Sequence, residues 1–239
     1  MKMEDSDSIR GKLLYEMKSG IFAECDRLPR ENILAEMLGI SRTHLRDILP
    51  ELEREGFITR RHGVGTVINR HVLNVANRMD LFVEFLDIIK LNGYEPEVVL
   101  SEVYEESADE LAARKLQIPV GTQVLRICRL CTADGNPAIY CEDILEKQLV
   151  RHKYEITDLR YPIYDFLPRF CEVSSYMDLT EIHAMVADER LAGLLEIPVG
   201  SPILNLEEVD YDIGGRAIFY SKEYFVDSLF LQTVLRKKL

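Results

Sequence analysis

Residues 28–67 read LPRENILAEMLGISRTHLRDILPELEREGFITRRHGVGTV, and this stretch decides the fold of the first part of the chain. Pro29 suits the first turn of a helix, where no backbone donor is needed, and Gly39 can take the left-handed conformation that ends a helix. Ser41 is a favourable N-cap for a second helix. The apolar residues of that second helix recur at i, i+3, i+4 and i+7, which are Leu45, Ile48, Leu49 and Leu52.

A two-stranded wing is predicted after the second helix, with strands over residues 57–61 and 66–68 around a turn that contains Gly63 and Gly65. Two short helices joined by a tight turn form a helix-turn-helix, whose second helix can lie in the DNA major groove. Arg side chains there can bind guanine edges or phosphates. On the residues alone, an ordinary helical hairpin with a solvated Arg face is the alternative.

The same stretch resembles the winged helix-turn-helix of GntR-type transcriptional regulators. The matching positions are Leu28-Pro29, Glu31, Leu34-Ala35, Gly39, Ser41-Arg42-Thr43, Arg46, Leu49, Leu52, Gly56 and Gly63-x-Gly65-Thr66. The resemblance implies a double-stranded DNA operator as partner. It also implies the DNA-binding residues, which are Ser41, Arg42, Thr43, His44, Arg46, His62 and Gly63.

Three residues of this stretch depart from the GntR pattern. Asn32 replaces the usual Arg of the first motif and removes one expected phosphate contact. His44 replaces the usual second Thr, so a different base preference is expected. Pro50 lies inside the apolar period, where proline costs roughly 3 kcal/mol in an ideal helix, so we expect a kink or an early end near Leu49.

The composition describes a globular chain of 239 residues, enough for two domains, with 47% hydrophobic and 29% charged residues. No run approaches the roughly 20 apolar residues of a membrane span, and the first residues are acidic, so we expect a cytoplasmic protein without membrane contact. The cysteine count of five argues against a disulfide framework. Cys128 and Cys131 have a metal-like spacing but would point to opposite faces of a strand. We therefore expect no metal and no cofactor.

The formal net charge of −12 is unevenly distributed. Residues 1–70 contain 12 basic and 12 acidic residues, which leaves 17 of the 29 basic and 29 of the 41 acidic residues to the rest of the chain. A neutral domain can still bind DNA if its Arg residues cluster on one face. We expect modest affinity for one subunit, which favours a homodimer that binds two half-sites.

The second part of the chain contains an internal repeat, because residues 108–121 match residues 187–200 at an offset of 79. Each copy is predicted as strand, short helix, strand, hairpin and strand. The predicted strands are 98–104, 124–130 and 138–144 in the first copy, and 178–184, 203–209 and 217–225 in the second. Two such copies can share one antiparallel sheet covered by helices, an α+β architecture. The repeat either leaves a cleft for a small ligand or records only a duplicated fold. Further helices are predicted over residues 8–19 and 81–91, with residues 69–79 as a linker.

Residues 80–239 resemble the UTRA domain of HutC-type GntR regulators, which is related in fold to chorismate lyase. The positions that carry the resemblance are Leu116-x-Ile118-Pro119-x-Gly121, Arg129 before Asp134-Gly135-x-Pro137, Ile197-Pro198-x-Gly200 and Tyr220-Ser221. The resemblance implies two domains, a winged helix-turn-helix over 1–70 and an effector-binding and dimerisation domain over 80–239. Such domains bind a small-molecule effector, which changes how the two DNA-binding domains of a dimer are spaced.

The predicted effector-binding residues are Arg129, Cys131, Glu142 and Tyr224. Many family members carry Arg-x-Arg where this chain has Arg129-Leu130-Cys131, so one anion-binding Arg is absent. A phosphate-binding Ser-Phe-Thr at the start of the domain's first helix is replaced by Arg78-Met79-Asp80. Pro162 replaces a Ser, and Ile218 a Glu, of the family pocket. We expect a zwitterion or small carboxylate, less charged than a sugar phosphate, although Arg129 can also be only a structural ion pair.

These patterns predict a cytoplasmic transcriptional regulator with an effector-controlled affinity for its operator, and the resemblance implies a repressor. Two alternatives remain, a second domain that only dimerises and a lyase-like enzyme fused to a DNA-binding domain. No nucleophile–base pair, Gly-rich phosphate loop or metal set supports the enzyme, so no catalytic residues are expected.

Overall fold

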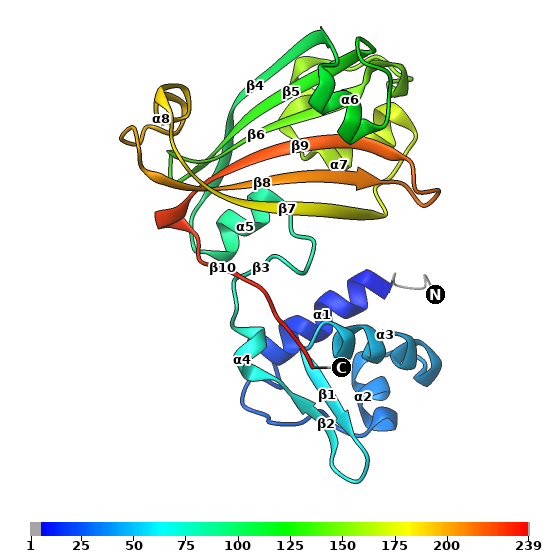
Figure 1. Ribbon diagram of the computed structural model, residues 1–239. Helices are drawn as coiled ribbons and strands as arrows, with labels where there is room; N and C mark the ends of the chain where they lie inside the picture. The colour runs from blue at the N-terminus through cyan, green and yellow to red at the C-terminus, as the bar shows by residue number, and fades with distance from the viewer. Residues whose placement is uncertain (1–5, 239) are drawn as a thin grey trace. The chain divides into compact units, whose positions relative to one another are not determined.

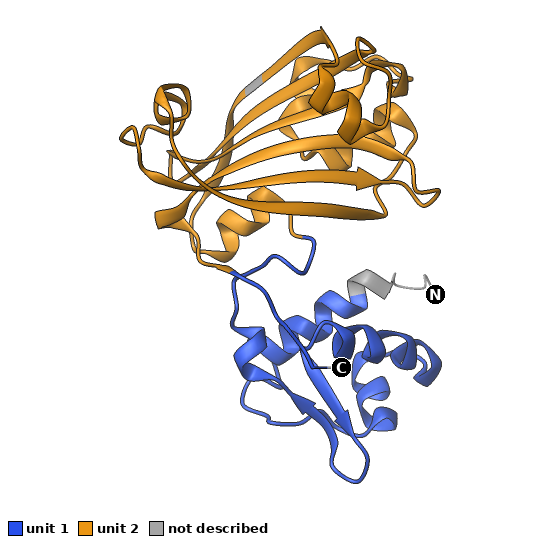
Figure 2. Ribbon diagram, viewed as in Figure 1, with its two compact units in different colours: residues 1–82, 233–239 blue, residues 83–232 orange. Residues whose placement is uncertain are grey.

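The computed structural model describes residues 6–238 of the chain, and Figure 2 shows its two compact units. One unit comprises residues 1–82 together with 233–239, and the other comprises residues 83–232. Residues 1–5 of the predicted first domain lie outside the described residues. The sequence predicts 80–239 as one domain, but the structure places 80–82 and the C-terminal tail, residues 233–239, in the first unit.

The first unit is a helical domain with a wing (Figure 1). Helices α1 (Ser6–Lys18), α2 (Glu31–Leu38) and α3 (Arg42–Arg54) precede the hairpin of β1 (Ile58–Arg61) and β2 (Gly65–Ile68). The predicted capping is confirmed, because Gly39 ends α2 in the left-handed conformation and the Ser41 hydroxyl accepts a hydrogen bond from the His44 backbone N–H. The apolar stripe of α3 lies in the core, where Leu45 and Leu52 are fully buried.

Two expectations for this unit need correction. Of the two outcomes expected at Pro50, the early end near Leu49 is wrong, because α3 continues through Pro50 to Arg54, and the kink stays a prediction. Buried side chains on both sides of the proline, at Leu49 and Leu52, hold the helix against the core, so packing outweighs the lost hydrogen bond. The predicted linker contains the short helix α4 (Arg70–Leu73), and its Arg70 guanidinium donates to backbone carbonyls of the first unit.

The second unit contains one antiparallel six-stranded sheet in the order β4-β5-β6-β9-β8-β7. The strands of the first repeat are β4 (Pro96–Ser107), β5 (Gln123–Ala133) and β6 (Asn136–Glu146), and those of the second are β7 (Met177–Val186), β8 (Pro202–Tyr211) and β9 (Ala217–Val226). The inner strands β6 and β9 join the two repeats, which confirms the predicted sheet of two related halves.

Helices cover both faces of this sheet. The repeat helices α6 (Glu110–Leu116) and α8 (Glu189–Leu195) pack on one face, against side chains such as Ile144 and Tyr140. Helix α7 (Ile163–Phe166) and the turns beside it pack on the other face, against residues such as Ile127. Short helical turns follow β6 and β9 and flank α7, over Lys147–Leu149, Ile156–Arg160, Leu167–Cys171 and Asp227–Leu229.

The first helix of the second unit begins later than predicted. Helix α5 runs over Phe85–Leu91 rather than from residue 81, because Glu84 at its N-cap is extended. The segment Arg78-Met79-Asp80 is therefore not at a helix start. Instead β3 (Asn77–Arg78) pairs with β10 (Gln232–Thr233) of the returning chain.

Candidate DNA-binding and effector sites

The N-terminal half of α3 presents a row of exposed polar side chains. Ser41, Arg42, Thr43 and Arg46 are exposed and His44 is half-buried. The opposite side of the same helix is buried, with Leu45 and Ile48 at 0% and 1% exposure. This burial fixes the helix, so its polar row has one orientation on the domain, as a major-groove helix requires.

The wing is a tight hairpin in which Arg61 pairs with Gly65. Gly63 and Gly65 have φ angles of +75° and +98°, a backbone conformation that favours glycine. This conformation explains why both positions of the wing motif are glycines. His62 and Gly63 are exposed at the tip. Arg27, a residue that the sequence analysis did not select, donates from Nη1 to the Val64 carbonyl at 3.2 Å and ties the tip to the domain.

The arginines of this surface differ in how they are paired. Arg46 Nε lies 2.8 Å from Glu31 Oε2 and Arg60 Nε lies 2.7 Å from Glu53 Oε2. The side chains of Arg42 and Arg61 have no hydrogen-bond or ion-pair partner among residues 6–238. Two unpaired guanidiniums, one on the helix and one on the wing, are available for phosphates or guanine edges without breaking an existing contact.

The four predicted effector residues do not share one site. Arg129 and Cys131 on β5 lie on the sheet face that α7 covers, together with Cys141 and Asp143 of β6. Glu142 and Tyr224 lie on the opposite face, which α8 covers. The division follows from strand alternation, because neighbouring positions on β6 point to opposite faces.

On the α7 face, Arg129 is fully buried and is paired with Asp143. Its Nη1 donates to the Tyr161 carbonyl at 2.8 Å, whereas its Nε has no hydrogen-bond partner among the described residues. Burial alone lowers the pKa of Arg129, but the Asp143 carboxylate outweighs this effect and raises it, so the guanidinium stays charged. The buried orphan donor is unusual, since buried polar groups are normally paired.

Further carboxylates gather on this face without a matching cation. Among the described residues, Glu208, Asp210 and Glu223 form no ion pair with a basic side chain. Burial raises the pKa of Asp210 to about 7, even though the Ser175 hydroxyl donates to it. Burial likewise raises the pKa values of Glu208 and Glu223.

Glu84, at the N-cap of α5, belongs to the same electrostatic environment. Burial raises its pKa to about 8, and the nearby Asp143 and Asp165 carboxylates add to the effect while Arg129 opposes it. The α7 face therefore holds an excess of acidic groups around one guanidinium. Tyr164 of α7 also reaches this group, because its hydroxyl lies 3.4 Å from Asp210 Oδ2.

The α8 face has a cavity of about 620 Å³. Its floor carries Glu142, which is held between Arg126 of β5, 2.7 Å away, and Arg190 of α8. Tyr140 and Tyr224 stack beside it with ring centroids 6.1 Å apart. The lining is completed by Leu100, Glu102, Tyr104, Cys128, Leu194 and Lys222. Both arginines are already neutralised by carboxylates, so the cavity has no strong excess of either charge.

One further group of side chains has metal-ligand spacing among the described residues, namely Glu181, His183 and Glu207. The Lys115 ammonium already lies 2.8 Å from Glu181 Oε1 and 3.5 Å from Glu207 Oε2. Cys128 and Cys131 are free thiols. The absence of a metal site stays a prediction.

Comparison with known proteins follows the two units. The UTRA domain family matches residues 91–230, and the gntR family of bacterial regulatory proteins matches residues 5–68. The chain is a GntR-family regulator of the HutC type. It is therefore a DNA-binding transcriptional regulator, and its operator affinity is controlled by a small-molecule effector of the UTRA domain.

Relatives of this GntR regulator span most of its length. The HTH-type transcriptional regulator GgaR of Escherichia coli (strain K12) is 23% identical over 90% of this chain and 84% of its own. The HTH-type transcriptional repressor NagR of Bacillus subtilis (strain 168) is 26% identical over 91% of this chain and 88% of its own.

Solved structures share the fold of the GntR regulator. The possible transcriptional regulator YydK from Bacillus subtilis superposes with a TM-score of 0.76 at 18% identity, covering 98% of this chain and 100% of that one. PhnF from Mycobacterium smegmatis superposes with a TM-score of 0.60 at 23% identity, covering 96% of this chain and 99% of that one. No helix of the described residues is long and apolar enough to span a membrane.

Proposed function

We propose that this regulator is a cytoplasmic, homodimeric repressor that binds a palindromic operator and leaves it when an effector binds. The observation that carries the proposal is the polar row of α3, exposed above a fully buried apolar stripe. With the wing, it supplies the DNA-binding residues predicted from the sequence: Ser41, Arg42, Thr43, His44, Arg46, His62 and Gly63.

Operator binding is tested by selecting sequences from a random duplex pool with the full chain and measuring affinity by fluorescence anisotropy. Arg42→Ala is the informative variant, because Arg42 is exposed at the start of α3 and has no partner to lose within the described residues. Arg54→Ala is the matched control, the same substitution at the other end of the same helix. A loss of affinity in the first variant alone supports the proposal, and equal affinities refute the assigned surface.

The homodimer is supported by an unusual edge strand. Four apolar side chains of β7, distributed over both of its faces, are more than half exposed: Met177, Leu179, Ile182 and Val186. The other edge strand, β4, begins with Pro96 and carries four glutamates, the devices that prevent edge pairing. Antiparallel pairing of two β7 strands about Ile182 places Glu181 of each copy opposite His183 of the other.

Light scattering on two variants tests the dimer, each variant carrying one new lysine on one of the two edge strands of the sheet. Ile182→Lys places two like charges together at the proposed two-fold axis and is expected to give monomers. Val99→Lys, on the exposed edge of β4, is the control and is expected to stay dimeric. A dimer in both variants excludes β7 as the interface.

The effector is proposed to bind at the α7 face and to carry a cationic amine. Ionised carboxylates that are held on this face without a cation are costly, and an ammonium group beside the half-buried Glu208 and the buried Asp210 and Glu223 offsets that cost. The orphan Arg129 Nε, which lies in the same group, can donate to a carboxylate or hydroxyl oxygen of the same ligand. These features support the zwitterion predicted from the sequence over a sugar phosphate.

The cavity of the α8 face is the second candidate, because it has a measurable volume and contains Glu142 and Tyr224. A thermal-shift panel of amino acids, amines, carboxylates and sugar phosphates identifies the ligand class. A ligand at about 100 times its dissociation constant stabilises by roughly 2.7 kcal/mol. Glu223→Gln is expected to abolish the ligand-induced rise in melting temperature, and Arg190→Ala is expected to leave it unchanged. If Arg190→Ala alone abolishes the rise, the effector binds at the α8 face.

The regulator is further proposed to have no catalytic activity. Among the described residues, Arg126 and Arg129 on the two sheet faces both lie in ion pairs with carboxylates, which leaves neither guanidinium free to activate a substrate. The bound metabolite is expected to be recovered unchanged after long incubation. The absence of any ligand from the panel would instead favour a domain that only dimerises.

A further inference from the structure

The C-terminal tail, residues 233–239, belongs to the DNA-binding unit although it follows the UTRA domain in the sequence (Figure 2). It enters this unit beside the linker, where Met79 N donates to the Thr233 carbonyl at 2.9 Å. The tail lies outside both matched family regions, which end at residues 68 and 230. The tail therefore lies outside the residues on which the family assignment rests.

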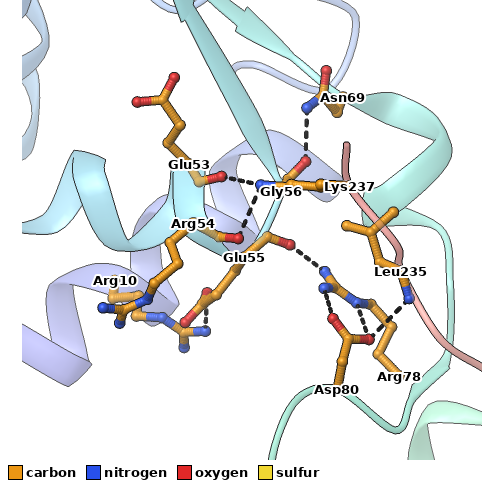
Figure 3. A network of polar contacts seen from close by, with 10 residues as sticks. All are labelled: Arg10, Glu53, Arg54, Glu55, Gly56, Asn69, Arg78, Asp80, Leu235 and Lys237. Atoms are coloured by element: carbon orange, nitrogen blue, oxygen red, sulfur yellow. Dashed lines mark hydrogen bonds and ion pairs between the residues drawn. The ribbon is translucent and has the colours of Figure 1, made fainter. Parts of the chain in front are cut away.

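The tail ends on the last turn of the recognition helix α3 (Figure 3). Lys237 Nζ donates to the Arg54 carbonyl at 2.9 Å and to the Glu53 carbonyl. The last carbonyls of a helix have no partner within the helix and lie at its negative end. The Lys237 ammonium therefore places positive charge at this helix end and donates to two of its carbonyls, of which that of Glu53 also accepts from the Gly56 N–H at 3.1 Å.

Gly56 makes this approach possible. Its φ of +85° turns the chain sharply after α3, and a Cβ atom at this position would lie only 2.4 Å from Leu235 Cδ2 and 3.1 Å from Lys237 Cε. The glycine of the family motif thus leaves a space in this chain that two tail residues occupy. The tail is seated on α3 by shape as well as by charge.

Two other cations hold the same helix end. Arg78 Nη1 donates to the Glu55 carbonyl at 2.5 Å, and its guanidinium lies 5.2 Å from the centroid of the Phe57 ring. Asp80, the ion-pair partner of Arg78, accepts from the Leu235 backbone N–H at 3.2 Å. Arg10 of α1 pairs with the Glu55 side chain at 2.6 Å. Linker and tail are therefore bound to one another and to α3.

We propose that the C-terminal tail is a working part of the DNA-binding domain and that Lys237 is a positioning residue for recognition. It acts on the operator through α3, whose exit it fixes, and not by touching DNA. The inference rests on the proposed role of α3 in operator binding. It predicts that a chain without its last residues has an intact sheet domain and a complete helix-turn-helix sequence but weakened DNA binding.

The experiment compares Lys237→Ala with Lys238→Ala in the full-length chain, by anisotropy with the selected operator duplex over a range of salt concentrations. Both variants remove one positive charge from the tail. The loss of a cation at a helix C-terminus is expected to weaken binding about two- to fivefold in Lys237→Ala. The Lys238 side chain forms no hydrogen bond or ion pair with α3 within the described part of the chain, so Lys238→Ala is expected to leave the affinity unchanged. Lys237→Arg should restore most of the affinity.

The salt dependence separates positioning from direct contact. A lysine that binds a DNA phosphate lowers the salt slope by about 1 when it is removed, whereas a positioning residue leaves the slope unchanged. A lower slope in Lys237→Ala, or equal affinities of the two alanine variants, would overturn the proposal. A wild-type chain that selects no duplex at all would instead refute the assigned DNA-binding function.

Discussion

Asp210 is predicted to make the UTRA domain less stable as the pH rises. The carboxyl is completely buried on β8, and burial raises its pKa from an ordinary value of 3.8 to about 7. The Glu208, Asp178 and Asp143 carboxylates raise it further, while the Ser175 hydroxyl opposes them. The Tyr164 hydroxyl also faces the group. The folded chain therefore keeps a proton that the unfolded chain releases.

The sign and size of the effect follow from these two pKa values. The stabilisation is complete below about pH 3.8 and is lost as the pH rises through about 7. The two values lie about 3 pH units apart, which at about 1.36 kcal/mol for each unit gives an upper limit of about 4 kcal/mol. Asp210→Asn removes this titration and is expected to stabilise the ligand-free domain at pH 8, with little effect at pH 4.

Equilibrium urea unfolding at several pH values tests this prediction, followed by tyrosine fluorescence because the chain has 11 Tyr and no Trp. The readout is the difference between wild type and variant, since the net charge of −12 makes both less stable at high pH. Asp227→Asn, on the exposed turn after β9, is the control for the loss of one charge. A wild-type–variant difference that does not change between pH 4 and pH 8 would refute the assignment of a buried, protonated acid.

The first unit allows three shorter predictions. Leu45→Ala should destabilise it by about 3 kcal/mol, as expected for a leucine with 0% exposure, and urea unfolding measures the loss. Arg46→Ala should weaken operator binding and either lower the salt slope by about 1 or relax the base preference, as anisotropy with mutated duplexes will show. Gly63→Ala has open space for its Cβ but a φ of +75°, so the wing should lose roughly 1 kcal/mol and operator affinity should fall without a change in the other unit.

The first unit could be predicted from the sequence because its signals are local. Gly39, Ser41 and the apolar stripe of α3 each specify a conformation within a few residues, and the structure has all three. The failure at Pro50 is of the opposite kind. An intrinsic preference of the backbone is overridden by side chains that pack against distant parts of the chain, which the local sequence does not reveal.

The division of the effector residues could not be predicted because of a β-bulge. The register of β5 and β6 shifts between Cys131 and Thr132, so Arg129 lies opposite Cys141. A regular hairpin without the extra residue would place Arg129 opposite Tyr140. Glu142 would then lie on the α7 face together with Arg129, instead of on the α8 face. One inserted position thus exchanges the two faces for every residue beyond the turn, while the order and length of the strands remain correctly predicted.

The C-terminal tail is beyond sequence-based prediction for a different physical reason. A few residues without an apolar period gain little free energy by burial. Their position depends on where the chain leaves the last long strand of the sheet. In this regulator that place is the exit of α3, held from the other side by Arg78 of the linker. The two chain segments that connect the UTRA domain to the DNA-binding domain therefore both end on the helix proposed to bind the operator.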